Sequence, residues 1–263
     1  MRMSKKYNTY YSGFVLFLTT SLFIACGAPA FYATAIEGKK LPVAAEYSNN
    51  HAIEDFVAPY RTHINKDLDS ILAYCPETLD KTNTINGWQT TIGNLMADVT
   101  LDKAATLLRT RENRNLDICL LNHGGIRSVI AKGPVTARTA FEVMPFENSL
   151  MVVALKGEQV MEMAQYIARE KKPHPLAGML ITLDENGSVK LVTVQGKPLQ
   201  AEKIYNVATS DYLVNGGDSM TFLGNAVATY DLTYKLRNVY IDYFKAIDTL
   251  PIIRTERIVI EKP

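Results

Sequence analysis

Apolar residues recur at helical spacing in several parts of the chain. From Ile53 to Leu72 they follow one another at three- and four-residue spacing, which predicts an amphipathic helix with its apolar stripe in the core. Thr90 or Thr91 can cap a second helix, because a threonine hydroxyl accepts from the first free backbone N–H groups. Helices are predicted over residues 91–109, 137–143, 157–169 and 234–247.

Short apolar runs between these helices predict β-strands. Residues 116–121 are almost wholly apolar, as in a strand that is buried on both faces. Residues 180–183 and 189–194 alternate around Asn186-Gly187, a dipeptide typical of hairpin turns. Further strands are predicted over residues 149–155, 204–209 and 257–260, the last at a sheet edge. This mixture predicts an α+β fold, a single domain with a mixed β-sheet flanked by helices.

The N-terminus has the layout of a targeting signal. Three basic residues within the first six positions precede a twelve-residue apolar run, which is too short to span a bilayer and ends just before Cys26. We expect lipidation of Cys26, which would anchor the protein to a membrane of the bacterial cell envelope, on the periplasmic side or at the cell surface. Ordinary secretion with cleavage between residues 25 and 30 is the alternative. The expected parts are a lipoprotein signal (1–25), a tether (26–50) and a domain (51–263).

Charge and cysteine usage narrow the classes of partner. The chain has 28 basic and 27 acidic residues, and removing the signal takes away three basic ones, which leaves 25 against 27. Because no basic stripe appears, we expect no nucleic-acid partner. Cys75 and Cys119 are able to pair in an oxidising compartment, but Cys119 lies inside an apolar strand and is better explained as a buried free thiol.

The strand at 116–121 leads into the sequence N-H-G-G-I-R at residues 122–127. The glycine pair allows positive φ angles and a close approach of the backbone to a ligand. Arg127 then stands just past a strand end, where α/β sheets bind ligands, and its planar fork suits a phosphate or a ribose diol. Phe146 follows a proline in a polar turn and can present its ring to solvent. Spacing alone favours the alternative, which is a tight turn, a surface arginine and a core phenylalanine.

A second stretch has similar features, a strand followed by a glycine pair and a charged residue. A strand ending at Thr209 is followed by Tyr212 and then by Gly216-Gly217-Asp218. Together the stretches resemble the C-terminal, substrate-binding domain of the 5′-nucleotidase/UDP-sugar hydrolase family. That family carries N-x-G-G-I-R, then P-F-x-N, then an aromatic residue six positions before the Asp of G-G-D. All three patterns occur here in this order, and the resemblance extends from about Phe56 to Pro263.

The resemblance implies a site for a nucleotide or nucleoside. Phe146 and Tyr212 would clamp the base between their rings, an interaction worth about 1–3 kcal/mol per base. Asn122 would bond the base or ribose, Asp218 would accept from the ribose hydroxyls, and Arg127 would hold ribose or phosphate. A turn-closing Asp218 and a half-buried core Tyr212 are the alternatives. The implied substrate-binding residues are Asn122, Gly125, Arg127, Phe146, Asn148, Tyr212 and Asp218.

Two family features are missing from this sequence. Before the helix at Thr91 the family commonly has arginines that reach the ligand, whereas this stretch offers only Lys81, a point charge without the bidentate fork. In the family, hydrolysis takes place on a separate N-terminal domain, where D-x-H, G-N-H-[DE] and further histidines hold two metal ions. None of the histidines at 51, 63, 123 and 174 stands in such a context. We therefore expect no catalytic residues and no metal or other cofactor in this chain.

These observations favour the hypothesis that this chain is the substrate-binding half of a split 5′-nucleotidase, an enzyme of nucleotide catabolism. A separately encoded metallophosphatase with divalent metals would be its partner, and this chain would be inactive in hydrolysis alone. The alternative is a non-catalytic lipoprotein that binds nucleosides or nucleotides. A metallophosphatase reading frame beside this one would favour the first hypothesis.

Overall fold

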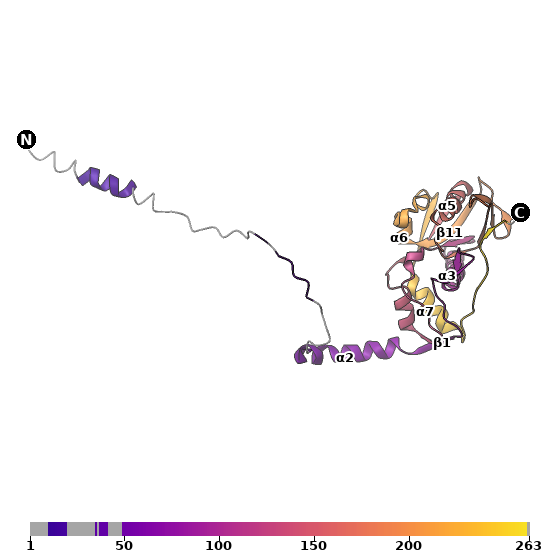
Figure 1. Ribbon diagram of the computed structural model, residues 1–263, viewed down its shortest axis with the longest axis horizontal. Helices are drawn as coiled ribbons and strands as arrows, with labels where there is room; N and C mark the ends of the chain where they lie inside the picture. The colour runs from indigo at the N-terminus through magenta and orange to yellow at the C-terminus, as the bar shows by residue number, and fades with distance from the viewer. Residues whose placement is uncertain (1–9, 20–34, 36, 42–48, 262–263) are drawn as a thin grey trace, which may run out of the picture. The chain divides into compact units, whose positions relative to one another are not determined.

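The computed structural model describes residues 10–19, 35, 37–41 and 49–261 (Figure 1). Residues 10–19 form a helix inside the expected signal, whereas Cys26 and most of the expected tether lie outside the described residues. Within the part of the chain that is described, no helix is both long enough and apolar enough to cross a membrane. Residues 54–263 make one compact unit, and they carry the fold described below.

A five-stranded mixed sheet runs through the domain. Its strands, in spatial order, are β12 (Ala228–Lys235), β6 (Ser149–Lys156), β11 (Ile204–Ser210), β4 (Ile118–Leu120) and β7 (Leu176–Ala177). β6 is antiparallel to both of its neighbours, and β11 is parallel to β4. The sequence predicts the three central strands but neither edge strand. β7 has only two residues, and in β12 the polar residues interrupt the apolar alternation.

A four-stranded sheet contains the predicted hairpin. Its strands, in spatial order, are β10 (Lys197–Pro198), β9 (Val189–Val194), β8 (Met179–Leu183) and β13 (Ile258–Ile260). Gly187 adopts a φ of 82° in the turn between β8 and β9, a conformation that glycine tolerates. β13 lies at the edge, as predicted, and parallel to β8. Two small antiparallel pairs join β1 (Ile71–Cys75) to β5 (Gly133–Thr136) and β2 (Thr84–Ile85) to β3 (Gln89–Thr90).

The predicted helices form close to their expected bounds. Thr90 accepts from the Gly93 N–H at 3.1 Å and so caps the helix that begins at Thr91, while Thr136 caps the helix that begins at Ala137 through the Thr139 N–H. Besides α2 (His51–Leu68), the long helices are α3 (Thr91–Glu112), α5 (Gly157–Glu170) and α7 (Leu236–Ala246). The short ones are α4 (Ala137–Val143), α6 (Asp211–Val214), η1 (His123–Gly125), η2 (Gly217–Ser219) and η3 (Thr221–Leu223).

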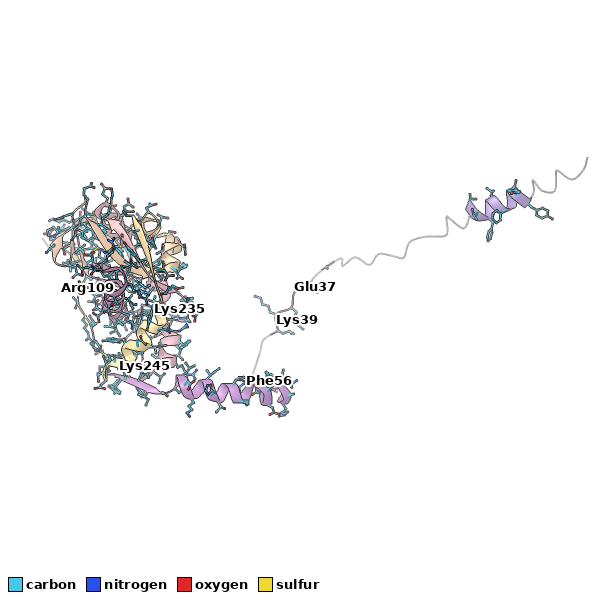
Figure 2. The ribbon with its side chains drawn as sticks, turned by 180° about the vertical axis from the view of Figure 1, so that it is seen from behind. Glu37, Lys39, Phe56, Arg109, Lys235 and Lys245 are labelled. Atoms are coloured by element: carbon cyan, nitrogen blue, oxygen red, sulfur yellow. The ribbon has the colours of Figure 1, made fainter. Side chains whose placement is uncertain are left out.

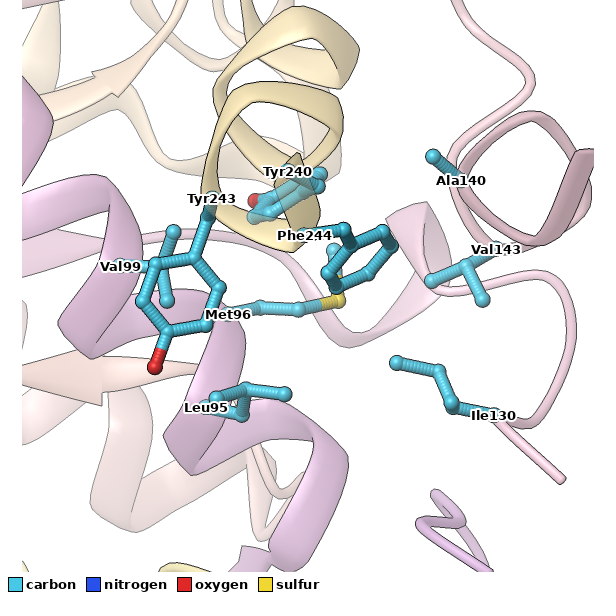
Figure 3. A pocket seen from close by; sticks show the side chains of 9 residues that line it. All are labelled: Leu95, Met96, Val99, Ile130, Ala140, Val143, Tyr240, Tyr243 and Phe244. Carbon is cyan, nitrogen blue, oxygen red and sulfur yellow. The ribbon is translucent and has the colours of Figure 1, made fainter. Parts of the chain in front are cut away.

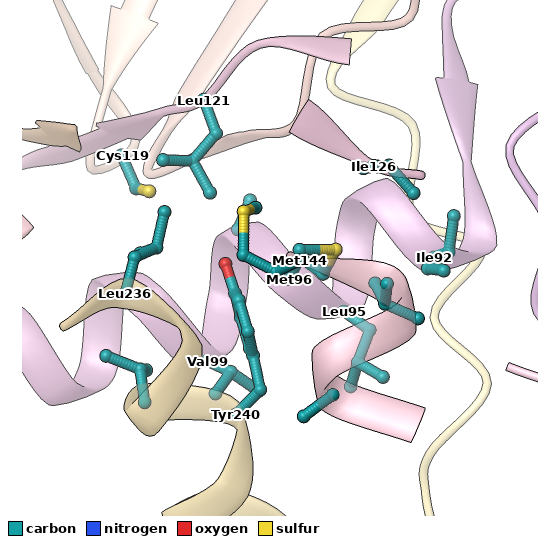
Figure 4. Close-up of a cluster of buried hydrophobic side chains, with 14 of the residues drawn as sticks. Ile92, Leu95, Met96, Val99, Cys119, Leu121, Ile126, Met144, Leu236 and Tyr240 are labelled. Carbon is teal, nitrogen blue, oxygen red and sulfur yellow. The ribbon is translucent and has the colours of Figure 1, made fainter. Parts of the chain in front are cut away.

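Alternate residues of the central strands serve two hydrophobic cores. In β4, Cys119 packs with the α3 and α7 core (Figure 4), whereas Ile118 packs with the core beneath α5. Figure 1 shows α5 on one side of the sheet and α3 and α7 on the other. Cys119 and Cys75 are buried free thiols, which confirms the prediction for Cys119. Trp88 also packs in a core.

A void lies between α3, α4 and α7 (Figure 3). It is lined by apolar side chains such as Met96, Val143 and Phe244, and its volume is about 10 Å³. A space of this size is at the lower limit for a single water molecule. The void is therefore a packing feature and not a ligand site.

The prediction for the helix between Ile53 and Leu72 is wrong in two respects. α2 (His51–Leu68) forms, but none of its residues is buried, and Phe56 and Tyr60 are 70% and 61% exposed (Figure 2). Its spacing is amphipathic, yet burial also needs a surface opposite the stripe, which the described part of the chain does not supply. Ile71, which the spacing assigns to this helix, instead begins β1.

Candidate functional site

The three sequence patterns meet at one edge of the central sheet. β4 and β11 are parallel neighbours, so the loops that follow Leu120 and Ser210 leave the same edge. β6 is antiparallel to β11, with Leu150 opposite Ser210, which brings the turn before Ser149 to that edge as well. The topology alone therefore gathers residues 122–127, 145–148 and 212–218.

A pocket of about 280 Å³ lies at this edge. It is lined by Asn122, Gly124, Gly125, Arg127, Phe146, Asn148, Tyr212 and Asp218. All seven residues singled out from the sequence are present, and Gly124 of the same glycine pair is added. Their roles toward a ligand stay predictions. Phe146 and Tyr212 are 40% and 45% exposed, so neither ring is a core side chain.

Asp218 links two of the converging loops. Its Oδ1 accepts from the Tyr212 hydroxyl and its Oδ2 from the Asn122 Nδ2, each at 2.9 Å. Its backbone lies in the left-handed region with a φ of 49°, as does that of Ser219 at 59°. Such strain costs roughly 1–3 kcal/mol and is typical of functional loops. The carboxylate thus bridges α6 and the 122–127 loop.

Two glycines make room for the polar and aromatic side chains of the pocket. A Cβ at Gly217 would lie 2.5 Å from Cε1 and Cζ of the Tyr212 ring. A Cβ at Gly125 would lie 2.9 Å from Oδ1 of Asn122. Both distances are shorter than van der Waals contact, so a side chain at either position would displace its neighbour.

Arg127 presents an exposed guanidinium to the pocket. Its backbone is fixed, because the Arg127 N–H donates to the Val143 carbonyl at 2.9 Å. The side chain is only loosely held, since Nη1 donates to the Gly124 carbonyl at 3.4 Å. The guanidinium carbon lies 5.9 Å from the centroid of the Phe146 ring. The fork can therefore turn toward an anionic or hydroxyl-bearing ligand.

Lys81 lies beside this loop and supports it. Its ammonium donates to the carbonyl of Ile126 at 2.7 Å, directly before Arg127. The residue does not line the pocket. In this structure Lys81 therefore holds the backbone of the loop, and an ammonium engaged in this way does not reproduce a bidentate arginine.

A buried histidine supports the other side of the loop. His174 is 3% exposed, and its Nδ1 accepts from the His123 backbone N–H at 3.2 Å. Burial lowers the pKa of His174 to about 4, so the ring is neutral at pH 7. Since Nδ1 is an acceptor, the proton is assigned to Nε2. The sequence analysis missed this role, because it considered His174 only as a metal ligand.

An adjoining hollow of about 380 Å³ shares Gly124 and Asp218 with the pocket and includes His123, Lys172 and His174 in its lining. His51 and His63 are exposed. Within the described ranges, no three His, Cys, Asp or Glu side chains are arranged to hold a metal ion.

Comparison with known proteins gives consistent matches. A family model described as 5′-nucleotidase, C-terminal domain, matches residues 76–225. A 5′-nucleotidase of Vibrio vulnificus is 26% identical over 190 residues, which is 70% of this chain and 32% of that protein. Protein UshA of Yersinia enterocolitica is 32% identical over 111 residues, 41% of this chain and 20% of that protein. The chain thus spans a third or less of these relatives.

Solved structures show the same fold. The 5′-nucleotidase precursor of Thermus thermophilus matches with a TM-score of 0.67 and 26% identity, over 80% of this chain and 43% of that one. The NAD nucleotidase of Haemophilus influenzae matches with a TM-score of 0.60 and 16% identity, over 81% of this chain and 42% of that one. At that identity the second match supports the fold alone.

Proposed function

The chain belongs to the family of 5′-nucleotidase C-terminal domains, and on that premise we propose that its pocket binds a nucleotide or nucleoside. The observation that carries this proposal is the gathering of Phe146, Tyr212 and Asp218 with Arg127 around one opening. Two half-exposed rings offer stacking surfaces to any base, because every base has a π face. The polar groups beside them match a ribose and its phosphate ester.

Each polar side chain of the pocket retains hydrogen-bond donors or acceptors for a ligand. A carboxylate has about four lone-pair sites, and Asp218 uses one of them for Tyr212 and another for Asn122, so it can still accept from ribose hydroxyls. Asn122 keeps its carbonyl oxygen and a second N–H for the base or the ribose. Arg127 would hold ribose or phosphate. Asn148 and Gly125 would complete the lining.

We further propose that hydrolysis takes place on a separate metallophosphatase chain. The pocket contributes one cationic side chain, Arg127, and one carboxylate, Asp218, whereas phosphoryl transfer needs dense positive charge around the transferring oxygens. The divalent metals of the reaction would belong to the partner. This chain would hold the base and leave the phosphate exposed to that partner. A binder without any partner is the alternative, and a phosphatase assay separates the two.

Calorimetric titration tests the binding proposal. Adenosine and uridine should each bind the purified protein, and free ribose should bind at least about fivefold more weakly, since it lacks a base to stack. Equal affinities for nucleoside and ribose would contradict the proposal that the site recognises the base. A total absence of binding would contradict the proposal that the ligand is a nucleoside.

Replacing Gly217 by alanine should weaken nucleoside binding. The new Cβ must displace the Tyr212 ring, and we expect a loss of about 2- to 10-fold, a fraction of one stacking interaction. Gly224→Ala is the matched control, because its Cβ would come no closer than 3.5 Å to the nearest neighbour, Thr221 O. If both variants bind as tightly as the wild type, the Tyr212 ring is not a contact.

We also propose that Cys26 is the lipidated N-terminus of a protein anchored in the bacterial cell envelope. The apolar run that ends just before Cys26 supports this proposal. Labelling of cells with a fatty acid should mark the wild type and leave Cys26→Ala unmarked. Equal label in the two proteins, or none in either, would refute the anchor.

A further inference from the structure

The turn that carries Phe146 has no regular secondary structure of its own. It connects α4 to β6 and spans residues 144–148. Phe146 and Asn148 both reach the pocket from this turn. Because an irregular turn of this kind has no ladder of backbone bonds, its conformation depends on the groups that satisfy its carbonyls.

Those groups come from the start of α7. Arg237 Nη1 lies 3.5 Å from the Met144 carbonyl and 3.4 Å from the carbonyl of Phe146 itself. Arg237 Nη2 pairs with the Glu147 carboxylate. A single planar guanidinium therefore bonds three successive parts of the turn, which a lysine ammonium cannot do with the same geometry.

The residues next to Arg237 reinforce this attachment. The Lys235 ammonium donates to the Glu147 carbonyl at 2.6 Å and to the Ser149 hydroxyl at 3.3 Å. The Leu236 N–H donates to the Asn148 carbonyl at 2.9 Å. The carbonyls of residues 146, 147 and 148 are thus all bonded from residues 235–237.

The Arg237 side chain is fixed in this position by burial and by a contact with an aromatic ring. It is 6% exposed, and its guanidinium carbon lies 4.0 Å from the centroid of the Phe141 ring in α4. A buried cation is unfavourable unless it is paired and bonded, and here Nη1 and Nη2 are bonded whereas the buried Nε has no hydrogen-bond partner in the described part of the chain. The partners of Arg237 all belong to the turn or to the helix before it. Arg237 itself does not line the pocket.

We propose that Arg237 is a positioning residue that sets the place of the Phe146 ring through the turn. The inference rests on the proposed function, in which Phe146 stacks on a base. Arg237 touches no ligand in this account. Its effect on binding passes through Phe146, which distinguishes it from a residue that only stabilises the fold.

Arg237→Lys and Arg257→Lys form a matched pair for the test. Arg257 is 7% exposed and bonds the Leu176 carbonyl and the Asp98 carboxylate, away from the turn. Both substitutions should lower the melting temperature. Only Arg237→Lys should weaken adenosine binding, by about 3- to 10-fold, a fraction of one stacking interaction. In a Phe146→Ala background, Arg237→Lys should cost no further affinity.

A second readout keeps this inference separate from the proposed function. With ring-labelled phenylalanine, the Phe146 NMR signal of the ligand-free protein should shift in Arg237→Lys and stay in place in Arg257→Lys. If the wild type binds no nucleoside, the proposed function fails while this signal still decides the positioning claim. If Arg237→Lys does not fold, Glu147→Gln removes the charge pair at a side chain that is 68% exposed. The inference is overturned if the signal does not move, or if Arg237→Lys loses the same affinity without the Phe146 ring.

Discussion

Phosphate release from AMP or UMP is expected to stay at the uncatalysed background when this chain is incubated alone with divalent metal. The pocket offers Arg127 as its single lining cation, and Asp218 is already bonded to Tyr212 and Asn122. Hydrolysis without metals would need a positioned nucleophile, a base and concentrated positive charge. Addition of the proposed metallophosphatase partner should raise the rate by about 10⁶-fold or more, the usual scale of enzymatic acceleration.

A colorimetric phosphate assay measures both states. The double variant Arg127→Ala, Asp218→Ala sets the baseline for the chain alone, and a chelator should abolish the turnover of the mixture. Robust, chelator-sensitive turnover by the lone chain would contradict this prediction. Such a result would place a metal site within the chain.

Removing either aromatic ring of the pocket should weaken nucleoside binding by about 5- to 100-fold, which corresponds to roughly 1–3 kcal/mol per stacked base. Phe146 and Tyr212 are both expected to show this loss in calorimetric titration as alanine variants. Their rings are 40% and 45% exposed at the pocket, so truncation should not open a cavity in a core. The effect is therefore expected in affinity and not in the melting temperature.

Tyr60→Ala provides the control for an exposed aromatic ring outside the pocket. Tyr60 lies on α2 and is 61% exposed. Its loss should leave nucleoside affinity unchanged. Affinities that are equal in wild type, Phe146→Ala and Tyr212→Ala would exclude the stacking clamp.

The candidate site could be predicted because each of its three sequence patterns is local, and the strand order of the sheet brings the three together. Each of the three patterns lies within a few residues of a strand, and the strand runs at 149–155 and 204–209 are plain in the sequence. The register between β11, β4 and β6 then places the three loops at one edge. Spacing and resemblance therefore identified the pocket lining without any knowledge of contacts.

Arg237 and His174 could not be found in this way. Arg237 is 93 positions away from Met144, whose carbonyl it bonds, and periodicity predicts α7 without saying which turn the helix meets. His174 supports the 122–127 loop from 51 positions away. Such long-range polar contacts depend on the final packing of elements, which a single sequence does not encode in any local pattern.

The apolar stripe of α2 shows the opposite case, in which the sequence predicts a burial that the structure does not show. Its residues have the spacing of a buried helix, but Phe56 is 70% exposed. Periodicity reports that one side of a helix is apolar, and burial additionally requires a matching surface. The helix is fixed to the domain near its C-terminal end, where Arg138 bonds Asn65 and Asp69. The local pattern therefore predicted the helix correctly and its burial wrongly.

The most direct test of the central claim is a crystal structure of the protein with adenosine bound. We predict that the base lies between the rings of Phe146 and Tyr212, with a ribose hydroxyl bonded to the carboxylate of Asp218. Electron density for the nucleoside at any other place, with the pocket at the sheet edge left empty, would contradict it.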